Sequence, residues 1–292
     1  MSLENARAIA LMTLSMAGFA VGDAMVKTAS DYMSIAQILI FMATPAAVLF
    51  AVMAHRSGQS VFSRSFLSGP VALRNSVEAV TAICMVSALA MAPLALVISI
   101  TQAVPLFVTI GAAVVLRETV GPRRWAAVLI GLVGVLLMLR PSEGGLSLGA
   151  ALALAAALGL ALRDLVTRIT PVSIGTLQMA AWGMFALIPA GIVMLPFTGP
   201  HENPSALGWL TVGVASIANA GAYYAITAAM RLGDVSAVTP FRYSRLLFAL
   251  IIAIVFFAER PDILTLIGAA IVIGSGLFVM WRERKASVSD NN

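Results

Sequence analysis

Long apolar runs follow one another along the whole chain, separated by short polar segments. The runs span residues 7–26, 34–54, 69–90, 93–115, 122–139, 147–167, 174–195, 206–229, 234–257 and 262–281. Each run is close to the roughly 20 apolar residues that a helix needs to cross a bilayer. The breaks carry Gly, Pro, Ser and charged residues, which are typical of turns and loops. The pattern therefore predicts an all-α integral membrane protein with ten transmembrane helices.

The composition supports a lipid environment. Of the 292 residues, 60% are hydrophobic and only 11% are charged, whereas a soluble domain carries about 25% charged residues. The formal net charge is +5, but the basic residues lie mostly at the ends of the runs, so membrane topology explains them better than nucleic-acid binding. We expect the lipid bilayer and a small-molecule substrate as partners, no nucleic acid, and a monomer or weak homodimer.

A shift of about 141 residues aligns the chain with itself. The aligned positions include Gly18 with Gly159, Asp23 with Asp164, Lys27 with Arg168, and Glu118 with Glu259. Rare charged residues that coincide at one ungapped offset indicate a duplication. Each half has five runs, and because five is odd the second half enters the membrane in the opposite orientation, as in many secondary transporters. We predict a first repeat over 1–140, an inverted second repeat over 141–285, and a disordered tail over 286–292.

Basic residues are distributed unequally between the two sides of the membrane. With the N-terminus inside, the inner segments hold Arg7, Arg56, Arg64, Arg117, Arg123, Arg124, Arg168, Arg231, Arg282, Arg284 and Lys285. The outer segments hold Lys27, Arg140 and Arg260. Cytoplasmic loops are enriched in Lys and Arg, so this bias predicts that both termini are cytoplasmic.

Two stretches of the sequence resemble a known family. Residues 103–107 through 116–118, followed by a span with Gly131 and Gly134, resemble the first EamA repeat of the drug/metabolite transporter superfamily. Residues 239–243 through 258–259, followed by a Gly-rich span, resemble the second repeat. Within this family the sequence looks most like bacterial amino-acid exporters of the YddG type.

The resemblance implies a ten-helix transporter of the bacterial inner (cytoplasmic) membrane. Its substrate cavity would be lined by the first four helices of each half, and the fifth and tenth helices would pack at the periphery. The halves differ at one informative place. Pro105 has no proline at its repeat equivalent, Leu246, where two arginines flank the region instead. The second half has therefore specialised.

Charged side chains deep in apolar runs are costly unless they are paired or hydrated, so they are candidate functional residues. Arg242 and Arg245 lie three residues apart in the ninth run, and Glu78 lies four residues after Arg74 in the third. The two cations would suit an anionic group such as a carboxylate. Glu78 would either form an intrahelical ion pair with Arg74, bind a substrate ammonium, or pair with one of the two arginines of the ninth run. Its repeat equivalent is Asn219, which is polar but uncharged.

Asp23 and Asp164 occupy equivalent places in the two halves, and each stands four residues before a cation, Lys27 and Arg168 respectively. One interpretation is a helix-end ion pair in each half. The alternative is a role in gating or in proton coupling. The inverted repeat places the first pair near the outer end of its helix and the second pair near the inner end.

Glu118 and Glu259 close the fourth and ninth runs. An acid at a helix C-terminus is unfavourable with the helix macrodipole. Both should therefore find hydrogen-bond donors nearby, in a structural role.

Scarce aromatic and amide side chains complete the candidate cavity. The chain has only four Trp and four Tyr, and those with amide or phenol groups well inside the runs are candidates for substrate binding. The predicted substrate-binding set is Glu78, Gln102, Trp182, Asn219, Tyr223, Arg242, Tyr243 and Arg245, and the gating or coupling set is Asp23, Lys27, Asp164 and Arg168. Pro45, Pro105, Pro189 and Pro240 are expected to kink their helices.

The motifs of enzymes and of metal sites are not found. The sequence contains no P-loop and no HExxH motif, and its only cysteine, Cys84, lies in an apolar run. We predict no enzymatic activity, no cofactor and no metal site. The predicted function is secondary transport that exports small neutral or aromatic amino acids by alternating access. The alternative is the same fold exporting another small metabolite or a drug.

Overall fold

The computed structural model describes residues 3–61, 63–118, 120–140, 146–171, 173–198, 203–232 and 238–289. Within these residues the structure is all-helical. Its helices are α1 (Leu3–Ala29), α2 (Ile35–Arg56), η1 (Arg64–Leu67), α3 (Gly69–Met91), α4 (Leu94–Thr101), α5 (Val104–Val115), α6 (Pro122–Leu139), α7 (Leu148–Arg168), α8 (Thr176–Met194), η2 (Leu195–Phe197), α9 (Ala206–Leu232), η3 (Thr239–Tyr243), α11 (Ser244–Phe256) and α12 (Ile263–Ser289). They form ten segments long and apolar enough to cross a membrane, which confirms the ten predicted helices.

The helices pack in the pattern that an inverted duplication requires. The repeat relates α1 to α7, α2 to α8, α3 to α9, α4 and α5 to η3 and α11, and α6 to α12. The extensive α1·α9 interface therefore has its equivalent in α3·α7, and both are formed. The α2·α8 and α6·α12 interfaces map onto themselves, as does the contact of the whole fourth span with the whole ninth span, which is made through α4 and α11, and all three are formed as well. The 5+5 arrangement is thus seen in the packing.

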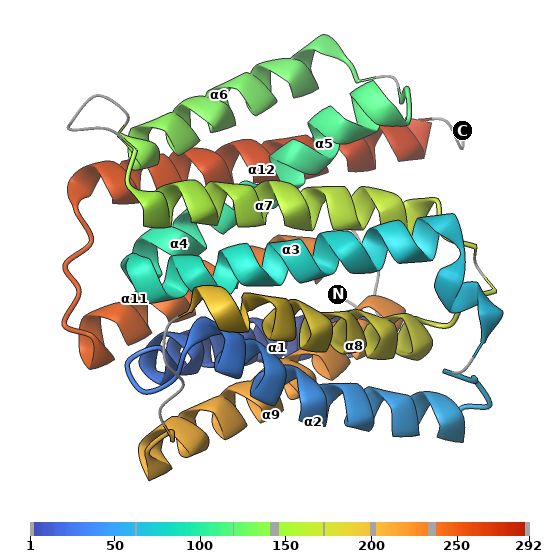
Figure 1. The fold of residues 1–292 in the computed structure, drawn as a ribbon. Coiled ribbons are helices and arrows are strands. Elements are labelled where there is room, and N and C mark those ends of the chain that lie inside the picture. Colours follow the sequence, from blue (N-terminus) through green and yellow to red (C-terminus); the bar gives the residue numbers. More distant parts are fainter. Residues whose placement is uncertain are drawn as a thin grey trace.

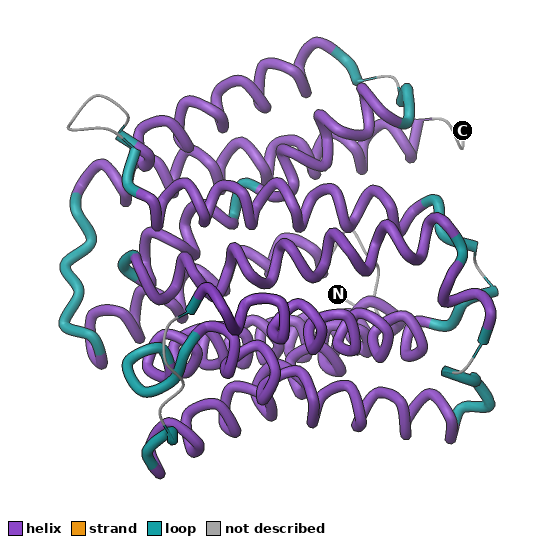
Figure 2. Tube along the Cα trace, in the orientation of Figure 1, coloured by secondary structure: helices purple, strands orange, loops and turns teal. Residues whose placement is uncertain are grey.

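All the long helices run side by side, with their connections at the two ends of the bundle (Figures 1 and 2). The C-terminus lies at the right in Figure 1, and because ten spans separate the termini, the N-terminus belongs to the same end of the bundle. We call this the proximal end and the opposite one the distal end. Helices α6 and α12 pack together along one edge of the bundle. The fifth and tenth spans are therefore peripheral, as the family resemblance implied.

The fourth and ninth spans are both broken, and the breaks are repeat-equivalent. Helix α4 ends at Thr101 and α5 begins at Val104, while η3 ends at Tyr243 and α11 begins at Ser244. The Gln102 side-chain Nε2 donates a hydrogen bond of 3.3 Å to the Tyr243 carbonyl, exactly one repeat (141 residues) along the chain. The second half keeps the break without the proline of the first half.

The C-terminal ends of these broken spans also match in backbone conformation. Arg117 and Ala258, one repeat apart, have positive φ of 55° and 50°. The following residues close the same turn. The Glu118 N–H bonds to the Ala112 carbonyl at 3.1 Å, and the equivalent bond in the second half is 2.9 Å long. Each of these bonds spans six positions along the chain and closes the turn around the residue with positive φ. The two acids thus take equivalent backbone positions.

One local expectation differs from the structure. Helix α12 continues to Ser289, so residues 286–289 are helical, whereas a disordered tail was expected, and 290–292 lie outside the described residues. The segment after residue 281 is rich in Arg, Glu, Lys and Ala, which are good helix formers, and has no Gly or Pro to end the helix. Pro45 and Pro189 lie inside α2 and α8, and the kinks expected there stay a prediction.

Candidate functional site

A row of polar side chains lies on one face of α3, near the proximal end. Arg74, Asn75, Glu78 and Thr81 follow the spacing of a single helix face, and all but Glu78 are buried. The Arg74 guanidinium pairs with Glu78, with 3.2 Å between Nη2 and Oε2, which confirms the intrahelical pair. Its Nη1 also donates to Asn75 Oδ1 at 3.2 Å and to the Met179 carbonyl of α8 at 3.1 Å. The α3 charges are therefore tied to a neighbouring helix.

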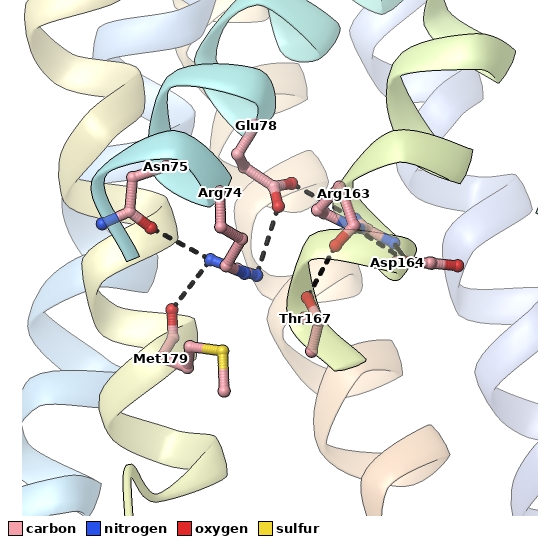
Figure 3. A network of polar contacts seen from close by, with 7 residues as sticks. All are labelled: Arg74, Asn75, Glu78, Arg163, Asp164, Thr167 and Met179. Atoms are coloured by element: carbon pink, nitrogen blue, oxygen red, sulfur yellow. Dashed lines mark hydrogen bonds and ion pairs between the residues drawn. The ribbon is translucent and has the colours of Figure 1, made fainter. Parts of the chain in front are cut away.

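Arg163 of α7 extends this row into a chain of alternating charges (Figure 3). Its Nη1 lies 3.3 Å from Glu78 Oε1. Its Nη2 and Nε donate to Asp164 Oδ1 at 2.8 and 3.1 Å. The order of charges is Arg74, Glu78, Arg163, Asp164, so each charge has an opposite neighbour. Buried charges persist only when they are paired in this way.

The sequence interpretation missed Arg163. The signal was available, because an arginine directly before Asp164 interrupts an apolar run. The repeat drew attention to Asp164 and Arg168 instead. The repeat equivalent of Arg163 is Gly22, so this cation belongs to one half only and a search for matching positions does not find it.

Glycines on α7 and α8 make room for the polar face of α3. A Cβ on Gly183 would lie 2.8 Å from Arg74 Nη1, and a Cβ on Gly159 would lie 2.1 Å from Thr81 Oγ1. A side chain at either glycine would require Arg74 or Thr81 to move from its present position. The close approach of small residues is a common way for membrane helices to associate. The polar face is thus enclosed by backbone on both sides.

A second ion pair joins α1 to α11. Arg245 Nη2 and Nε donate to Asp23 Oδ2 at 2.6 and 3.1 Å, and the Asp23 side chain is only 8% exposed. The guanidinium also lies over the Phe19 ring, 5.3 Å from its centroid. Asp23 therefore does not pair with Lys27, and the expected helix-end pair within α1 is wrong. The i, i+4 spacing allowed that pair, but a closer bidentate partner on another helix takes the carboxylate.

Lys27 binds Glu259 at the distal end of the bundle. Its Nζ lies 3.7 Å from Glu259 Oε1 and donates to the Ala92 carbonyl at 2.7 Å. The Glu259 carboxylate accepts from the backbone N–H groups of Leu94 at 2.8 Å and Ala95 at 3.1 Å. Glu259 thus caps the positive N-terminus of α4. The expectation that this acid finds donors nearby is confirmed.

The repeat-equivalent pair at the proximal end is much looser. Arg168 Nη1 lies 3.2 Å from Glu118 Oε1, and these side chains are 51% and 52% exposed. The corresponding values for Lys27 and Glu259 are 20% and 13%. The ion pair at these equivalent positions is therefore largely enclosed at the distal end and half exposed at the proximal end. Arg168 also does not pair with Asp164, whose carboxylate is bound to Arg163 instead.

Arg242 stands apart from the other cations. Its side chain is exposed and forms no ion pair or hydrogen bond to another described residue. It therefore takes no part in the chain of paired charges on α3 and α7.

Tyr223 of α9 lies beside a cavity. Its ring packs edge-on against Phe50, 5.1 Å between centroids. The same residue lines a cavity of about 290 Å³. The other lining residues are Thr176, Ile226, Thr227 and Met230. Because Thr176 begins α8 at the proximal end, the cavity lies on that side of the bundle.

Trp182, one of the candidate cavity residues, holds a loop in this structure. Its indole N–H donates to the Val61 carbonyl at 2.8 Å, and the side chain is fully buried. Phe66 packs against its ring at 5.7 Å. Gln178, also on α8, donates to Ser63 Oγ at 3.4 Å. These contacts bind the α2–α3 connection to α8 at the proximal end, and they leave the Trp182 indole no free polar atom.

The three remaining candidates lie away from the α3–α7 charges. Gln102 bridges the two helix breaks. The Tyr243 hydroxyl is buried without a partner and points at α12, where it lies 1.8 Å from the place of a Cβ on Gly276. Asn219 donates to the Ala215 carbonyl of its own helix at 2.9 Å. Of the predicted binding set, Glu78 lies in the chain of paired charges and Tyr223 lines the cavity.

Ten membrane-spanning helices in two inverted halves, with paired charges buried between them, define the architecture of a membrane transporter. The profile of the EamA-like transporter family matches residues 6–140 and again residues 147–281. The protein therefore belongs to the EamA-like transporter family, whose members move small molecules across membranes and are not enzymes.

Known relatives and a solved structure agree with this family. The S-adenosylmethionine uptake transporter of Rickettsia prowazekii is 27% identical over 202 residues, which cover 69% of this chain and 68% of the relative. The riboflavin transporter of Rhizobium johnstonii is 29% identical over 203 residues, covering 68% and 66%. A crystal structure with 19% identity matches with a TM-score of 0.66 over 96% of this chain and 98% of the other. The resemblance to amino-acid exporters thus identified the family, while these relatives are named for other solutes.

Proposed function

We propose that this protein is a secondary transporter of the bacterial inner membrane that exports small neutral or aromatic amino acids by alternating access. The observation that carries the proposal is the difference between the two ends. The Lys27–Glu259 pair is sealed at the distal end, and its repeat equivalent, Arg168–Glu118, is exposed at the proximal end. Alternating access requires one half to close a contact that the other half leaves open, and the two equivalent ion pairs differ in this way.

The distribution of basic residues supports the orientation. The proximal end carries the termini and most of the Lys and Arg residues of the loops, so we assign it to the cytoplasm. The cavity beside Tyr223 then opens toward the cytoplasm. In this state the transporter would take its substrate from the cell interior, and the distal latch of Lys27 and Glu259 would prevent release.

The paired charges and the relatives support a substrate with charged groups. A neutral hydrocarbon solute would not require four arginines and three acids between the helices. S-adenosylmethionine, for which several relatives are named, carries the α-amino and α-carboxylate groups of an amino acid. The riboflavin transporters among the relatives favour the alternative of a flat aromatic metabolite. Direction in a secondary transporter follows the gradients, so relatives named for uptake are compatible with export here.

Transport in proteoliposomes tests the proposal. The purified protein is reconstituted and offered labelled methionine, phenylalanine, tryptophan, S-adenosylmethionine and riboflavin, with empty liposomes as the control. We expect saturable transport of the amino acids. Transport of riboflavin alone by a folded protein would overturn the amino-acid assignment in favour of the alternative.

Accessibility of single cysteines tests the mechanism. Cys84 is the only cysteine, so Cys84→Ala gives a background for Thr227→Cys in the proximal cavity and Ala95→Cys under the distal latch. We expect an impermeant maleimide to label position 227 from the cytoplasmic side, and substrate to change the two labelling rates in opposite directions. Rates that rise or fall together would contradict alternating access.

A further inference from the structure

The wall of the cavity beside Tyr223 comes mainly from one side of α9. Tyr223, Ile226, Thr227 and Met230 line it, and their spacing of three and four residues places them on one face of the helix. All four are half-buried. Tyr224, the next residue along α9, is 58% exposed and does not line the cavity. The cavity therefore lies on a different side of α9 from the exposed side.

Two hydrophobic clusters hold this wall in place. Tyr223 packs against the cluster that contains Phe50 of α2, and the two rings are 5.1 Å apart between centroids. Ile226 and Met230 pack against a second cluster, which contains Met12 of α1. The wall is thus supported by two neighbouring helices. A wall that keeps its shape when a solute enters can select solutes by size, as largely pre-formed ligand sites do.

The cavity extends along α9 toward the proximal end of the bundle. Helix α9 ends there at Leu232, so Met230 lies near the opening. Tyr223 is seven residues earlier, about 10 Å deeper along the helix axis at 1.5 Å per residue. Thr176, the first residue of α8, completes the lining at the proximal end. Tyr223 therefore forms the inner end of the cavity and Met230 its mouth.

The chemistry of the lining favours an uncharged group. None of the five described residues that line the cavity carries a charge. Thr227 already donates its hydroxyl hydrogen to the Tyr223 carbonyl at 2.8 Å. An ammonium or carboxylate placed here would lose water without meeting an opposite charge in the lining, which is costly. A phenol ring, a thioether and a branched alkyl group instead suit an apolar or aromatic side chain.

The size of the cavity suits one amino-acid side chain. Its volume is about 290 Å³, at the low end for ligand cavities and equal to about ten water molecules at roughly 30 Å³ each. Riboflavin, with three fused rings and a ribityl chain, would be a much tighter fit. Met230 at the mouth is unbranched and flexible, so it can adapt to side chains of different shape.

We propose that this face of α9 is the subsite for the uncharged side chain of the transported amino acid, with Tyr223 as its floor and Met230 as the residue that limits the size it accepts. The inference rests on the proposed function and extends it, because it names the residues that determine specificity. It also assigns a role to Thr227, whose position in the middle of the wall keeps charged side chains out.

Transport kinetics in proteoliposomes test the size limit. The KM is measured for labelled methionine and labelled tryptophan. Met230→Ala widens the mouth and should lower the KM ratio of tryptophan to methionine about tenfold, the scale of a small change in an apolar pocket. Met230→Trp narrows the mouth and should raise the same ratio. An unchanged ratio in both folded variants would overturn the subsite.

A gain of specificity tests the exclusion of charge. Thr227→Asp places a carboxylate in the wall, so we expect lysine to compete with methionine in this variant and not in the wild type. Loss of folding cannot produce such a gain. Lysine that fails to compete, in a Thr227→Asp protein that still transports methionine, would also overturn the subsite.

Controls separate the subsite from the fold and from the proposed function. Tyr224→Ala changes an exposed neighbour on the same helix and should leave the KM ratio and the response to lysine unchanged. Thermal unfolding in detergent monitors the fold of each variant. A wild-type protein that transports methionine, with variants that fail the tests above, would overturn the subsite alone. A wild-type protein that moves no amino acid would overturn the proposed function and the subsite with it.

Discussion

The internal repeat relates the α3·α7 interface to the α1·α9 interface, and the two interfaces pack in the same way. Their side-chain chemistry differs. In the first, Glu78 meets Arg163 at 3.3 Å. In the second, the repeat-equivalent residues Asn219 and Gly22 meet so closely that a Cβ on the glycine would lie 2.5 Å from Asn219 Nδ2. The contact has been kept while its charges are present in one half only.

The same comparison holds one turn further along the helices. Thr81 packs on Gly159 in α3·α7, and Ala222 packs on Gly18 in α1·α9, where a Cβ on the glycine would lie 3.0 Å from the Ala222 Cβ. Small residues in equivalent places keep both helix pairs close. The comparison shows that small residues keep the two helix pairs packed alike. The polar residues at equivalent positions differ, and such a difference suits the recognition of a substrate that has no symmetry.

Converting one interface into the other should have the largest effect. Arg163→Gly alone leaves Glu78 and Asp164 short of a partner and should destabilise the protein by about 3–5 kcal/mol. The triple variant Arg74→Ala, Glu78→Asn, Arg163→Gly copies Ala215, Asn219 and Gly22. We expect thermal unfolding in detergent to show the triple variant more stable than the single one. Both variants leave Asp164 without Arg163, so a triple variant no more stable than Arg163→Gly would show that the uncharged copy of the interface packs no better than the buried Arg74–Glu78 pair.

The triple variant also separates stability from transport. It removes the charges beside Asp164, so we expect it to fold but to lose substrate transport in proteoliposomes. The wild type, measured in parallel, is the control. Full transport by the triple variant would mean that the α3–α7 charges serve structure only.

The ion pairs at the ends of α1 and α7 should contribute less to stability than the α3·α7 charges. Glu259→Ala removes the acceptor of two backbone N–H groups at the α4 N-terminus and should cost about 1–3 kcal/mol. Glu118→Ala removes a half-exposed pair and should cost less than about 1 kcal/mol. Melting temperatures of the two variants measure the difference. Equal losses of melting temperature would indicate that the Lys27–Glu259 and Arg168–Glu118 pairs are equally enclosed in solution.

The helix breaks give the smallest expected effect. Gln102 uses its amide to bond the Tyr243 carbonyl, while the hydroxyl of its repeat partner Tyr243 has no hydrogen-bond partner. Gln102→Leu should therefore cost about 1 kcal/mol, and Tyr243→Phe should be neutral or stabilise slightly. Thermal unfolding of the two variants tests this order, and a larger loss for Tyr243→Phe would contradict it.

The sequence predicts the fold well because the membrane constrains it strongly. Apolar length predicts the ten spans, since each helix must satisfy its own backbone in lipid. The shift of 141 residues predicts the inverted repeat through Asp23, Asp164, Glu118 and Glu259. Each of these acids occupies an equivalent place in the structure, so the register was correct.

The partners of the charged residues are less predictable. Sequence spacing favours Asp23 with Lys27, but the aspartate binds Arg245, which is 222 positions away. Such partners depend on which helices become neighbours and on which side chain reaches deepest, and neither is visible in a hydropathy pattern. Trp182 illustrates the same limit, because the carbonyl that it binds belongs to a loop whose path the pattern does not describe.

The hydrogen bond from Gln102 to Tyr243 has a mechanical consequence. It joins the bend of the fourth span to the bend of the ninth at the point where the halves meet. A movement that straightens one bend must strain this bond unless the other bend responds. If the halves alternate as proposed, this bond would couple the two bends during the change. Such coupling would guard against a state open to both sides, through which ions and metabolites would leak and dissipate the gradients of the cell.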